Sequence, residues 1–433
     1  MPTLRAHSTL AQIGQLAAQR RVHQAFRFLH LNDGRLLDWQ RGLTAIPAPP
    51  FGEGPRAQWL LAQFQALGLC ETSIDSEGNV LGLLPQSEQP EPSHREEAER
   101  ATLVLSAHID TVFPLGTSIE PQIHGKRLVA PGACDNAAGV TGLLAIAAAL
   151  LDANFDLPCR VLFIGNVGEE GEGNLRGMRY LYQNSAWRDM IVANIVLDGA
   201  GSEVAVTEAL GSRRFLVTVS GPGGHSWTDA GAPNPIAILS EAIARLAALE
   251  LSEELPTAPR TTLNVGTIEG GSSVNAIPER AAARFDLRST GSEQLIRLEV
   301  ELHRAVEDAV LRANAAATSG SARRKQQVAH FTIENIGDRP AGRLADDSAL
   351  AQTLRAVDRH LGIRTETRVA STDANIPLSL GIPAVSLGAG GDGGGIHTRN
   401  EWYDPTGREL ALKRILLLVL ATAERCGEPA ENL

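Results

Sequence analysis

The chain has 433 residues with 50 acidic and 39 basic side chains, which gives a formal net charge of −11 at pH 7. This acidic balance argues against binding of nucleic acid through its backbone, because such binding requires a basic face. The length favours two domains, and a hydrophobic content of 43% with 21% charged residues is typical of a globular protein.

The four cysteines and the apolar segments indicate the cellular compartment. The cysteines form no CxxC pair, and their spacing implies no disulfide framework. The N-terminus lacks the apolar core of a signal peptide, and the longest apolar run, residues 137–151, is too short to span a bilayer. We therefore expect a cytoplasmic protein that does not interact with a membrane.

The first half of the chain alternates helical patterns with short apolar runs. Helices are predicted over residues 1–30, 33–46, 58–69 and 137–153, and buried strands over 101–108, 160–167 and 193–199. Residues 85–100 are rich in Pro, Glu and Ser, which predicts an exposed loop. Strands that alternate with helices indicate an α/β domain with a largely parallel sheet.

The pattern changes near residue 212 and changes back near residue 340. Strands are predicted over 213–221, 261–271, 281–289 and 327–337, with helices over 235–250 and 292–316. This β-α-β-β-α-β order is that of a ferredoxin-like sandwich. The α/β pattern then resumes with a helix over 350–362, a strand over 383–388 and a helix over 408–426. We predict an α/β domain formed by 1–211 and 340–433, with an α+β module, 212–339, inserted into it.

An acidic cluster directly follows the apolar run 160–167. Glu169, Glu170 and Glu172 occur within four positions, and like charges this close repel each other. A bound cation would relieve the repulsion, and so would a proton held on one carboxyl group for catalysis.

Metal-ligand residue types also follow other predicted strands or open a predicted helix. These are His108 and Asp110, Glu169 and Glu170, Asp198, His397 after a glycine-rich loop, and Asp135 before the helix at 137. The carboxyl ends of parallel strands share one edge of a sheet, so the side chains are expected to converge. Imidazoles with carboxylates suit Zn²⁺, Co²⁺ or Mn²⁺, and the set is large enough for two ions that share a carboxylate and activate a water. A carboxylate two residues beyond His108 would hold its second ring nitrogen and fix the tautomer.

Five motifs in this order resemble one enzyme family. AHIDTV, GACDNAAG, NVGEEGEGNLRG, VLDG and GGGIHTRNEW look like the signature of the co-catalytic dizinc exopeptidases and deacylases, which include peptidase T, carboxypeptidase G, acetylornithine deacetylase and succinyl-diaminopimelate desuccinylase. The resemblance extends from about residue 33 through the inserted module, known in that family as a lid or dimerisation domain. It implies a zinc-exopeptidase-like (phosphorylase/hydrolase-like) catalytic domain with a ferredoxin-like lid.

The resemblance also implies the roles of the metal-site residues. Asp135 would bridge two divalent ions, with zinc expected and cobalt or manganese as alternatives. His108 and Asp198 would bind one ion, and Glu170 and His397 the other. Glu169 would be the general base, and Asp110 the partner that supports His108.

Three residues of the inserted module would act on the substrate. His225, in GPGGHSW, resembles a lid histidine that reaches the active site, often from the partner subunit. Asn275, in SSVNAIPE, resembles a substrate contact, and Arg288, in FDLRS, resembles a residue that grips a substrate carboxylate. A histidine in a turn and an arginine on a surface strand are the plain structural alternatives. The family would also pair two chains through the lid into a homodimer.

The predicted function is hydrolysis of a peptide or amide bond in a small substrate. A peptidase T-like exopeptidase acting on di- or tripeptides is the first hypothesis, and an N-acyl-amino-acid deacylase resembling acetylornithine deacetylase is the second. A catalytically inactive binding protein on the same fold is a third hypothesis of another class. It is disfavoured because every proposed ligand is present together with Glu169.

Overall fold

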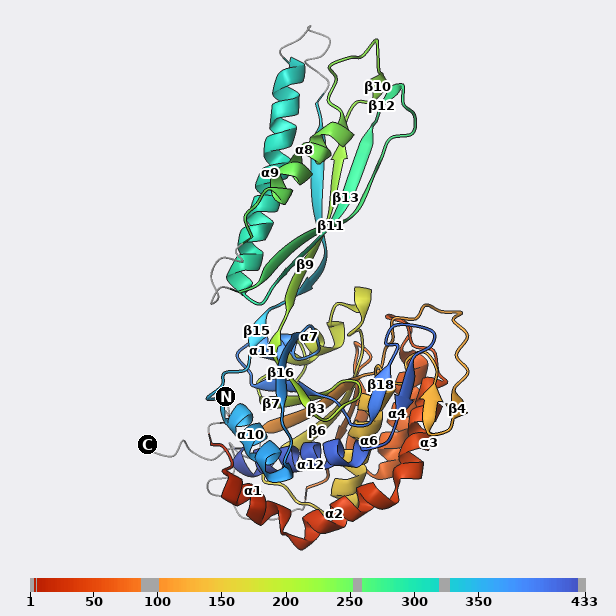
Figure 1. Ribbon diagram of the computed structural model, residues 1–433, viewed down its shortest axis with the longest axis vertical. Coiled ribbons are helices and arrows are strands. Elements are labelled where there is room, and N and C mark those ends of the chain that lie inside the picture. The colour runs from red at the N-terminus through yellow and green to blue at the C-terminus, as the bar shows by residue number, and fades with distance from the viewer. Residues whose placement is uncertain (1–3, 5, 87–100, 252–258, 319–327, 427–433) are drawn as a thin grey trace. The chain divides into compact units, whose positions relative to one another are not determined.

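The computed structural model describes residues 4, 6–86, 101–251, 259–318 and 328–426 (Figure 1). The chain divides into two compact units, here called unit 1 and unit 2. Unit 1 comprises residues 1–209 and 343–433, and unit 2 comprises residues 210–342. Most of the loop predicted at 85–100 lies outside the described residues.

Unit 1 is built on a nine-stranded sheet with the strand order β1-β2-β6-β3-β7-β17-β8-β15, in which β16 also pairs with β8. The strands are β1 (Cys70–Ile74), β2 (Val80–Leu83), β3 (Thr102–His108), β6 (Arg160–Asn166), β7 (Ile191–Leu197), β8 (Val204–Ala209), β15 (Gly342–Arg343), β16 (Glu366–Ala370) and β17 (Ala384–Leu387). In the middle of the sheet, β3 runs parallel to β6 and β7, and β17 runs parallel to β7. The predicted parallel sheet therefore exists at the centre, whereas the pairs β1–β2, β2–β6 and β8–β17 are antiparallel.

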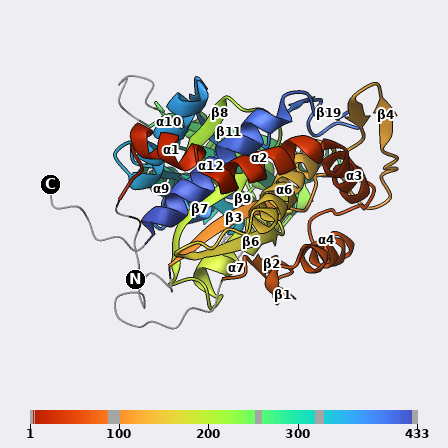
Figure 2. The ribbon, with the colours of Figure 1, turned by 90° about the horizontal axis from the view of Figure 1, so that it is seen from below.

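Helices cover both faces of this sheet. They are α1 (Leu10–Ala17), α2 (Arg20–Leu31), α3 (Asp33–Thr44), α4 (Gly54–Leu67), α6 (Ala137–Asp152), α7 (Arg176–Gln183), α10 (Ala349–Leu361), α11 (Asn375–Ser379) and α12 (Arg408–Arg425). The main core joins α6, α12 and the N-terminal helices to one face, while α7 and α11 pack on the other (Figure 2). Among the described residues, no helix has the length and apolarity that crossing a membrane requires.

The N-terminal helical pattern forms two helices that complete the outer layer of unit 1. Helix α1 begins with a capping box in which Thr9 and Gln12 exchange hydrogen bonds. It packs against α10 and α12, and α2 packs against α6. The apolar faces of these amphipathic helices bury Ile13, Val22 and Leu29, so α1 and α2 are an integral part of the unit 1 core.

A second, four-stranded sheet in unit 1 has the order β18-β19-β5-β4. Its strands are β4 (Gln122–His124), β5 (Arg127–Val129), β18 (Asp392–Gly394) and β19 (Trp402–Asp404). Trp402 on β19 pairs with Val129 on β5. The start of the loop that follows β5 therefore lies beside the end of the loop that precedes β19, although the two loops are distant in the sequence.

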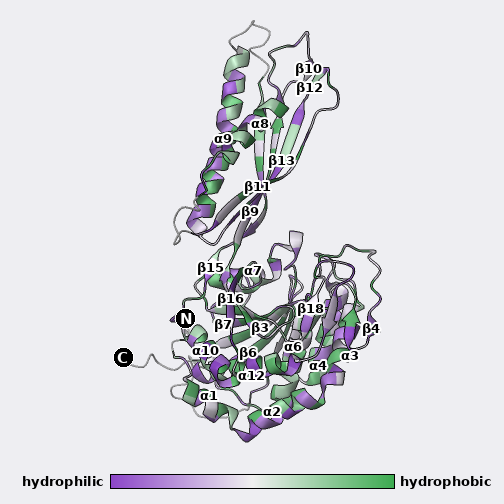
Figure 3. Cartoon of the chain, in the orientation of Figure 1, coloured by the Kyte–Doolittle hydropathy of each residue, from purple (hydrophilic) through white to green (hydrophobic). Residues whose placement is uncertain are grey.

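Unit 2 has the element order predicted for a ferredoxin-like sandwich. Its main elements are β9 (Gly211–Ser220), α8 (Pro235–Ala247), β11 (Thr261–Gly270), β13 (Arg280–Ser289), α9 (Ser292–Thr318) and β14 (His330–Arg339). The sheet order is β11-β13-β9-β14, and every neighbouring pair is antiparallel. Both helices bury apolar side chains against this sheet, and α9 shows the two-faced colouring of an amphipathic helix (Figure 3).

Candidate metal centre

Three of the five predicted ligands lie at the carboxyl edge of the large sheet. His108 ends β3, Glu170 follows β6, and Asp198 follows β7 directly. The other two ligands come from the small sheet, with Asp135 in the loop after β5 and His397 in the loop before β19. The two sheets of unit 1 therefore meet at the site, each with its own set of donors.

Asp135 lies between the two histidines. Its Oδ1 atom is 3.2 Å from Nε2 of His108, and its Oδ2 atom is 3.0 Å from Nε2 of His397. Oε1 of Glu170 is 3.1 Å from the same nitrogen of His397, and Oδ1 of Asp198 is 3.8 Å from Nε2 of His108. The structure thus brings all five residues together, in two groups that share Asp135.

Asp110 supports two of these residues without facing the shared carboxylate. Its backbone oxygen lies 3.2 Å from Nδ1 of His108, and its carboxylate oxygen lies 3.5 Å from the same nitrogen. The carboxylate also accepts the backbone N–H groups of Glu169 at 3.1 Å and Glu170 at 2.8 Å. With acceptors facing Nδ1, a proton resides there, which leaves Nε2, the nitrogen that faces Asp135, as the one that would coordinate a metal once its own proton is released.

The charges in the site shift the pKa values of its residues. Burial opposes a charge on His108, but Asp110, Asp135 and Asp198 raise its pKa well above the ordinary value. Hydrogen bonding to Asp135 raises the pKa of His397 to about 9. Burial would raise the pKa of Asp135, yet its two histidine partners hold that pKa below the usual range.

Glu170 shows the opposite displacement. Burial, together with the negative charge of Asp135, raises the pKa of Glu170 to about 7. A buried carboxyl group beside a buried carboxylate gains a proton unless a cation is bound. Glu170 therefore requires positive charge nearby, and a proton supplies it when no metal is bound.

The donors fit divalent metal ions. His108, Asp135 and Glu170 each offer one ligand atom, and these atoms lie within 4.8 Å of one another. Oδ1 of Asp135 is buried and faces Nε2 of His108 at 3.2 Å without a regular hydrogen bond among the described residues, and a buried carboxylate oxygen in such a position is stabilised by positive charge. Imidazole nitrogens with carboxylate oxygens are the donor set that zinc, cobalt and manganese share.

Sequence analysis did not identify several buried side chains that build this site. Asn136 caps α6 through its Oδ1 atom, which accepts the backbone N–H groups of Gly139 and Gly199 at 3.0 Å each. Its Nδ2 atom donates to the backbone oxygen of Leu197 at 2.9 Å. Asn136 therefore ties the loop of Asp135 to the strand end that carries Asp198, and the sequence signal was its position as the N-cap residue of a predicted helix.

Glu401 and Arg56 are also fully buried and contact the backbone close to the predicted ligands. The Glu401 carboxylate accepts backbone N–H groups from the loop of Asp135. Nη1 of Arg56 donates to the backbone oxygen of Ile109 at 3.0 Å. Glu401 belongs to the same GGGIHTRNEW motif as His397, which was the available signal, whereas no local pattern distinguishes Arg56 from a surface arginine.

Two residues predicted to contact the substrate meet in unit 2. The short strands β10 (Gly224–His225) and β12 (Ala276–Ile277) pair, so that His225 lies opposite Ala276. The backbone N–H of Ser226 donates to the backbone oxygen of Asn275 at 3.0 Å. Both predicted residues are exposed. Nδ1 of His225 accepts the backbone N–H of Trp227 at 3.2 Å, so the proton resides on Nε2, which is then a hydrogen-bond donor.

Arg288 lies apart from that pair within unit 2. It is on β13, eight residues beyond Arg280, which places it roughly 26 Å along the strand from the end nearest β12. Its Nε atom donates to the Asp286 carboxylate at 2.7 Å, and its side chain remains 39% exposed. The structure therefore gives Arg288 a local ion pair and does not group it with His225 and Asn275.

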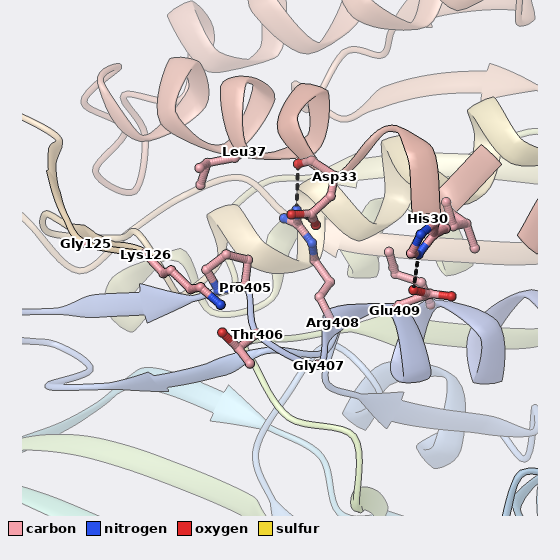
Figure 4. A pocket seen from close by; sticks show the side chains of 12 residues that line it. His30, Asp33, Leu37, Gly125, Lys126, Pro405, Thr406, Gly407, Arg408 and Glu409 are labelled. Carbon is pink, nitrogen blue, oxygen red and sulfur yellow. Dashed lines mark hydrogen bonds and ion pairs between the residues drawn. The ribbon is translucent and has the colours of Figure 1, made fainter. Parts of the chain in front are cut away.

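A pocket of about 510 Å³ in unit 1 lies at the N-terminus of α12 (Figure 4). Two polar side-chain contacts lie in its wall. Nη2 of Arg408 donates to the backbone oxygen of Asp33 at 2.9 Å and contacts its carboxylate, while Nδ1 of His30 lies 2.9 Å from the Glu409 carboxylate. The predicted metal ligands are not among its lining residues, and its charges largely satisfy one another.

Comparison with known proteins gives matches along most of the chain. Residues 104–422 match the profile of Peptidase family M20/M25/M40. A probable carboxypeptidase of Uncinocarpus reesii is 27% identical over 279 residues, which span 60% of this chain and 62% of that protein. A tripeptidase structure from Staphylococcus aureus superposes with a TM-score of 0.71 at 22% identity, covering 90% of this chain and 99% of that one. The Bacillus subtilis protein YXEP, described as a dinuclear metal binding peptidase, superposes with a TM-score of 0.64 at 16% identity, covering 91% of this chain and 99% of that one.

Proposed function

The chain belongs to Peptidase family M20/M25/M40 and is a metal-dependent hydrolase, and from this premise we propose that it is an exopeptidase acting on di- or tripeptides. The proposal rests on one observation above others, which is the position of Asp135 between the imidazoles of His108 and His397. A carboxylate that faces a nitrogen donor on each side is suited to bridge two cations. The resemblance to a tripeptidase fold and the match to a probable carboxypeptidase support the choice of small peptides.

In this proposal Asp135 would be shared by two divalent ions, with zinc as the first candidate. His108 and Asp198 would complete one set of ligands, and Glu170 and His397 would complete the other. When bound, such ions would act as Lewis acids toward the substrate carbonyl and toward the attacking water. Asp110 keeps His108 in the tautomer whose Nε2 lone pair is available for coordination.

Glu169 is the proposed general base. It is 6% exposed and adjoins Glu170, and its backbone N–H is held by the Asp110 carboxylate at 3.1 Å. Its carboxylate accepts a proton from the attacking water and then returns that proton to the nitrogen of the departing amine. The two glutamates would therefore have different roles: Glu170 would bind a metal ion, and Glu169 would transfer the proton.

The substrate would also be bound by unit 2, which we propose as the lid and dimerisation domain, with unit 1 as the catalytic domain. The Nε2–H donor of His225 would stabilise the oxyanion that develops on the carbonyl. Asn275 adjoins His225 and would contact the peptide backbone. Arg288 would bind a substrate carboxylate in exchange for part of its contact with Asp286.

A substrate panel tests this function. Purified protein would be loaded with Zn²⁺, Co²⁺ or Mn²⁺ and assayed against free dipeptides, free tripeptides and N-acetyl amino acids, with metal content measured on the same samples. Hydrolysis of free peptides with about two ions per chain is the expected result. Turnover restricted to acylated amino acids would replace the peptidase with the deacylase, and less than one tightly bound ion would contradict a two-metal enzyme of either kind.

A further inference from the structure

We propose that Glu401 is a positioning residue that sets the shared carboxylate of Asp135 between His108 and His397. The inference rests on the proposed function, because it assigns to Asp135 the bridging position. It concerns a residue that touches neither substrate nor metal. Glu401 acts only through the backbone of the loop that carries Asp135.

The hydrogen bonds that Glu401 accepts all come from that loop. Oε1 accepts the backbone N–H groups of Cys134 and Asp135 at 2.8 Å each, and Oε2 accepts the backbone N–H of Gly132 at 3.0 Å. The backbone oxygen of Glu401 also accepts the N–H of Ala130 at 3.0 Å. One residue therefore receives four amide groups from six consecutive positions, 130–135, and one of these amides belongs to the predicted bridging residue itself.

The loop needs such an acceptor because its amides are buried outside regular structure. Gly132, Ala133 and Cys134 are buried in a turn between β5 and α6. A buried N–H group without a partner costs about 1–3 kcal/mol, so the turn is stable only where an acceptor is supplied. A carboxylate serves here better than a neutral side chain, because two charged oxygens can satisfy three donors.

The same contacts direct the Glu401 carboxylate to the backbone of that loop. The residue is fully buried, and it is not one of the three residues whose ligand atoms lie within 4.8 Å of one another. It lies four positions beyond His397, so the carboxylate also joins the loop of His397 to the loop of Asp135. The relative placement of these two donors thus depends on the length and charge of the Glu401 side chain.

A buried arginine, Arg56, lies close enough to Glu401 and Asp110 to interact with their charges. Its guanidinium is fully buried, donates to the backbone oxygen of Ile46 at 2.7 Å and to that of Ile109 at 3.0 Å. Burial lowers the pKa of Arg56 to about 10, while the charges of Asp110 and Glu401 act to raise it. One buried cation is therefore near the two carboxylates that hold the ligand-bearing loops of this centre.

The test compares Glu401→Gln with the wild-type protein and with Asp75→Asn. The Gln amide would place an NH2 group against a backbone N–H, so at least one of the three hydrogen bonds accepted by the carboxylate is lost. Asp75 is a matched control, because its Oδ1 atom accepts the backbone N–H groups of Glu77, Gly78 and Asn79 at 2.9 Å each, and none of these residues is a predicted ligand. Metal-free samples would be titrated with Co²⁺ while the visible d–d absorption is recorded, and kcat and KM would be measured at saturating Co²⁺.

Glu401→Gln should bind Co²⁺ about 10–100-fold more weakly than wild type, as is typical when support of a ligand is lost. Its d–d spectrum should change, and kcat should fall more than KM rises, whereas Asp75→Asn should match the wild type in all three readouts. Glu401→Asp, which keeps the charge but shortens the reach, would be measured in the same way if the Gln variant does not fold. If the wild-type protein binds two Co²⁺ ions and the Glu401 variants show the same affinity and spectrum, this inference is overturned and the proposed function is not. Wild-type protein that binds none would overturn the proposed function as well.

Discussion

Oδ2 of Asp135 lies 3.0 Å from Nε2 of His397, and this contact raises the pKa of His397 to about 9. The same site raises the pKa of His108 well above its ordinary value and that of Glu170 to about 7. At neutral pH the metal-free protein therefore holds protons where the proposed function places cations. Metal binding must displace these protons, since a ligand atom coordinates through its free lone pair.

Metal binding at pH 7 should accordingly release roughly two protons from the imidazoles of His108 and His397, with a further fraction from Glu170. The affinity should fall as the pH is lowered from 9 toward 6, because each protonated donor competes with the metal. Calorimetric titration of the metal-free protein with Zn²⁺ in two buffers of different ionisation enthalpy measures the number released. Heats that do not depend on the buffer would contradict this prediction.

Glu169→Gln should separate catalysis from metal binding. The Gln side chain cannot accept the proton, so kcat should fall by about 10²–10⁴-fold, while the metal content stays at the wild-type value. Glu172→Gln is the matched control, because Glu172 lies in the same loop but is exposed, and its kcat should not change. A Gln variant at position 169 with undiminished kcat would remove Glu169 from the mechanism.

His225→Ala should lower kcat by about 10²–10³-fold, the usual loss for one oxyanion donor, without loss of metal. If the lid histidine acts on the partner's active site, equal mixtures of the inactive Glu169→Gln and His225→Ala proteins should regain part of the activity after exchange of subunits. Activity of the mixture and its mass by light scattering are measured together. Full activity of His225→Ala alone would contradict the assigned role.

The extent to which the sequence predicts this site depends on where each ligand lies. His108, Glu170 and Asp198 follow apolar runs long enough to be recognised as strands, and the common edge of parallel strands predicts that they converge. Asp135 and His397 belong to the small sheet, whose strands β5 and β19 have three residues each. Runs this short carry no periodicity, so the small sheet was not predicted. Asp135 was instead placed by the helix that follows it and His397 by the strand and the glycine-rich loop that precede it, and the family resemblance supplied their roles.

The supporting residues were less accessible to sequence analysis, because their partners are backbone groups far away in the chain. Glu401 binds amides at residues 132–135, and Arg56 binds the carbonyl of Ile109. No spacing or composition encodes such pairs. Unit 2 is the opposite case, since its long strands and amphipathic helices predict the ferredoxin-like order, whereas the two-residue strands β10 and β12 were not anticipated.

Asp373 gives a prediction for stability. Its carboxyl group is fully buried and accepts one hydrogen bond from Nδ2 of Asn166 at 2.8 Å. Burial raises its pKa to about 7, so between about pH 4 and 7 the folded protein holds a proton that the unfolded chain has lost. The stability contributed by this group is therefore complete at low pH and is lost as the pH rises through 7.

Asp373→Asn removes this titration and keeps an acceptor for Asn166. In metal-free protein, the free energy of unfolding of the variant relative to wild type should increase as the pH is raised from 5 to 8. Urea denaturation at several pH values provides the comparison. A difference between the two proteins that stays constant across this range would show that the carboxyl group of Asp373 does not titrate there.

The central claim is that Asp135 is shared by two cations, and anomalous diffraction from crystals of the Zn²⁺-loaded protein tests it most directly. Data collected at the zinc absorption edge should give two peaks on opposite sides of the Asp135 carboxylate, one beside His108 and Asp198 and the other beside Glu170 and His397. A single peak, or peaks that leave Asp135 uncoordinated, would contradict the account.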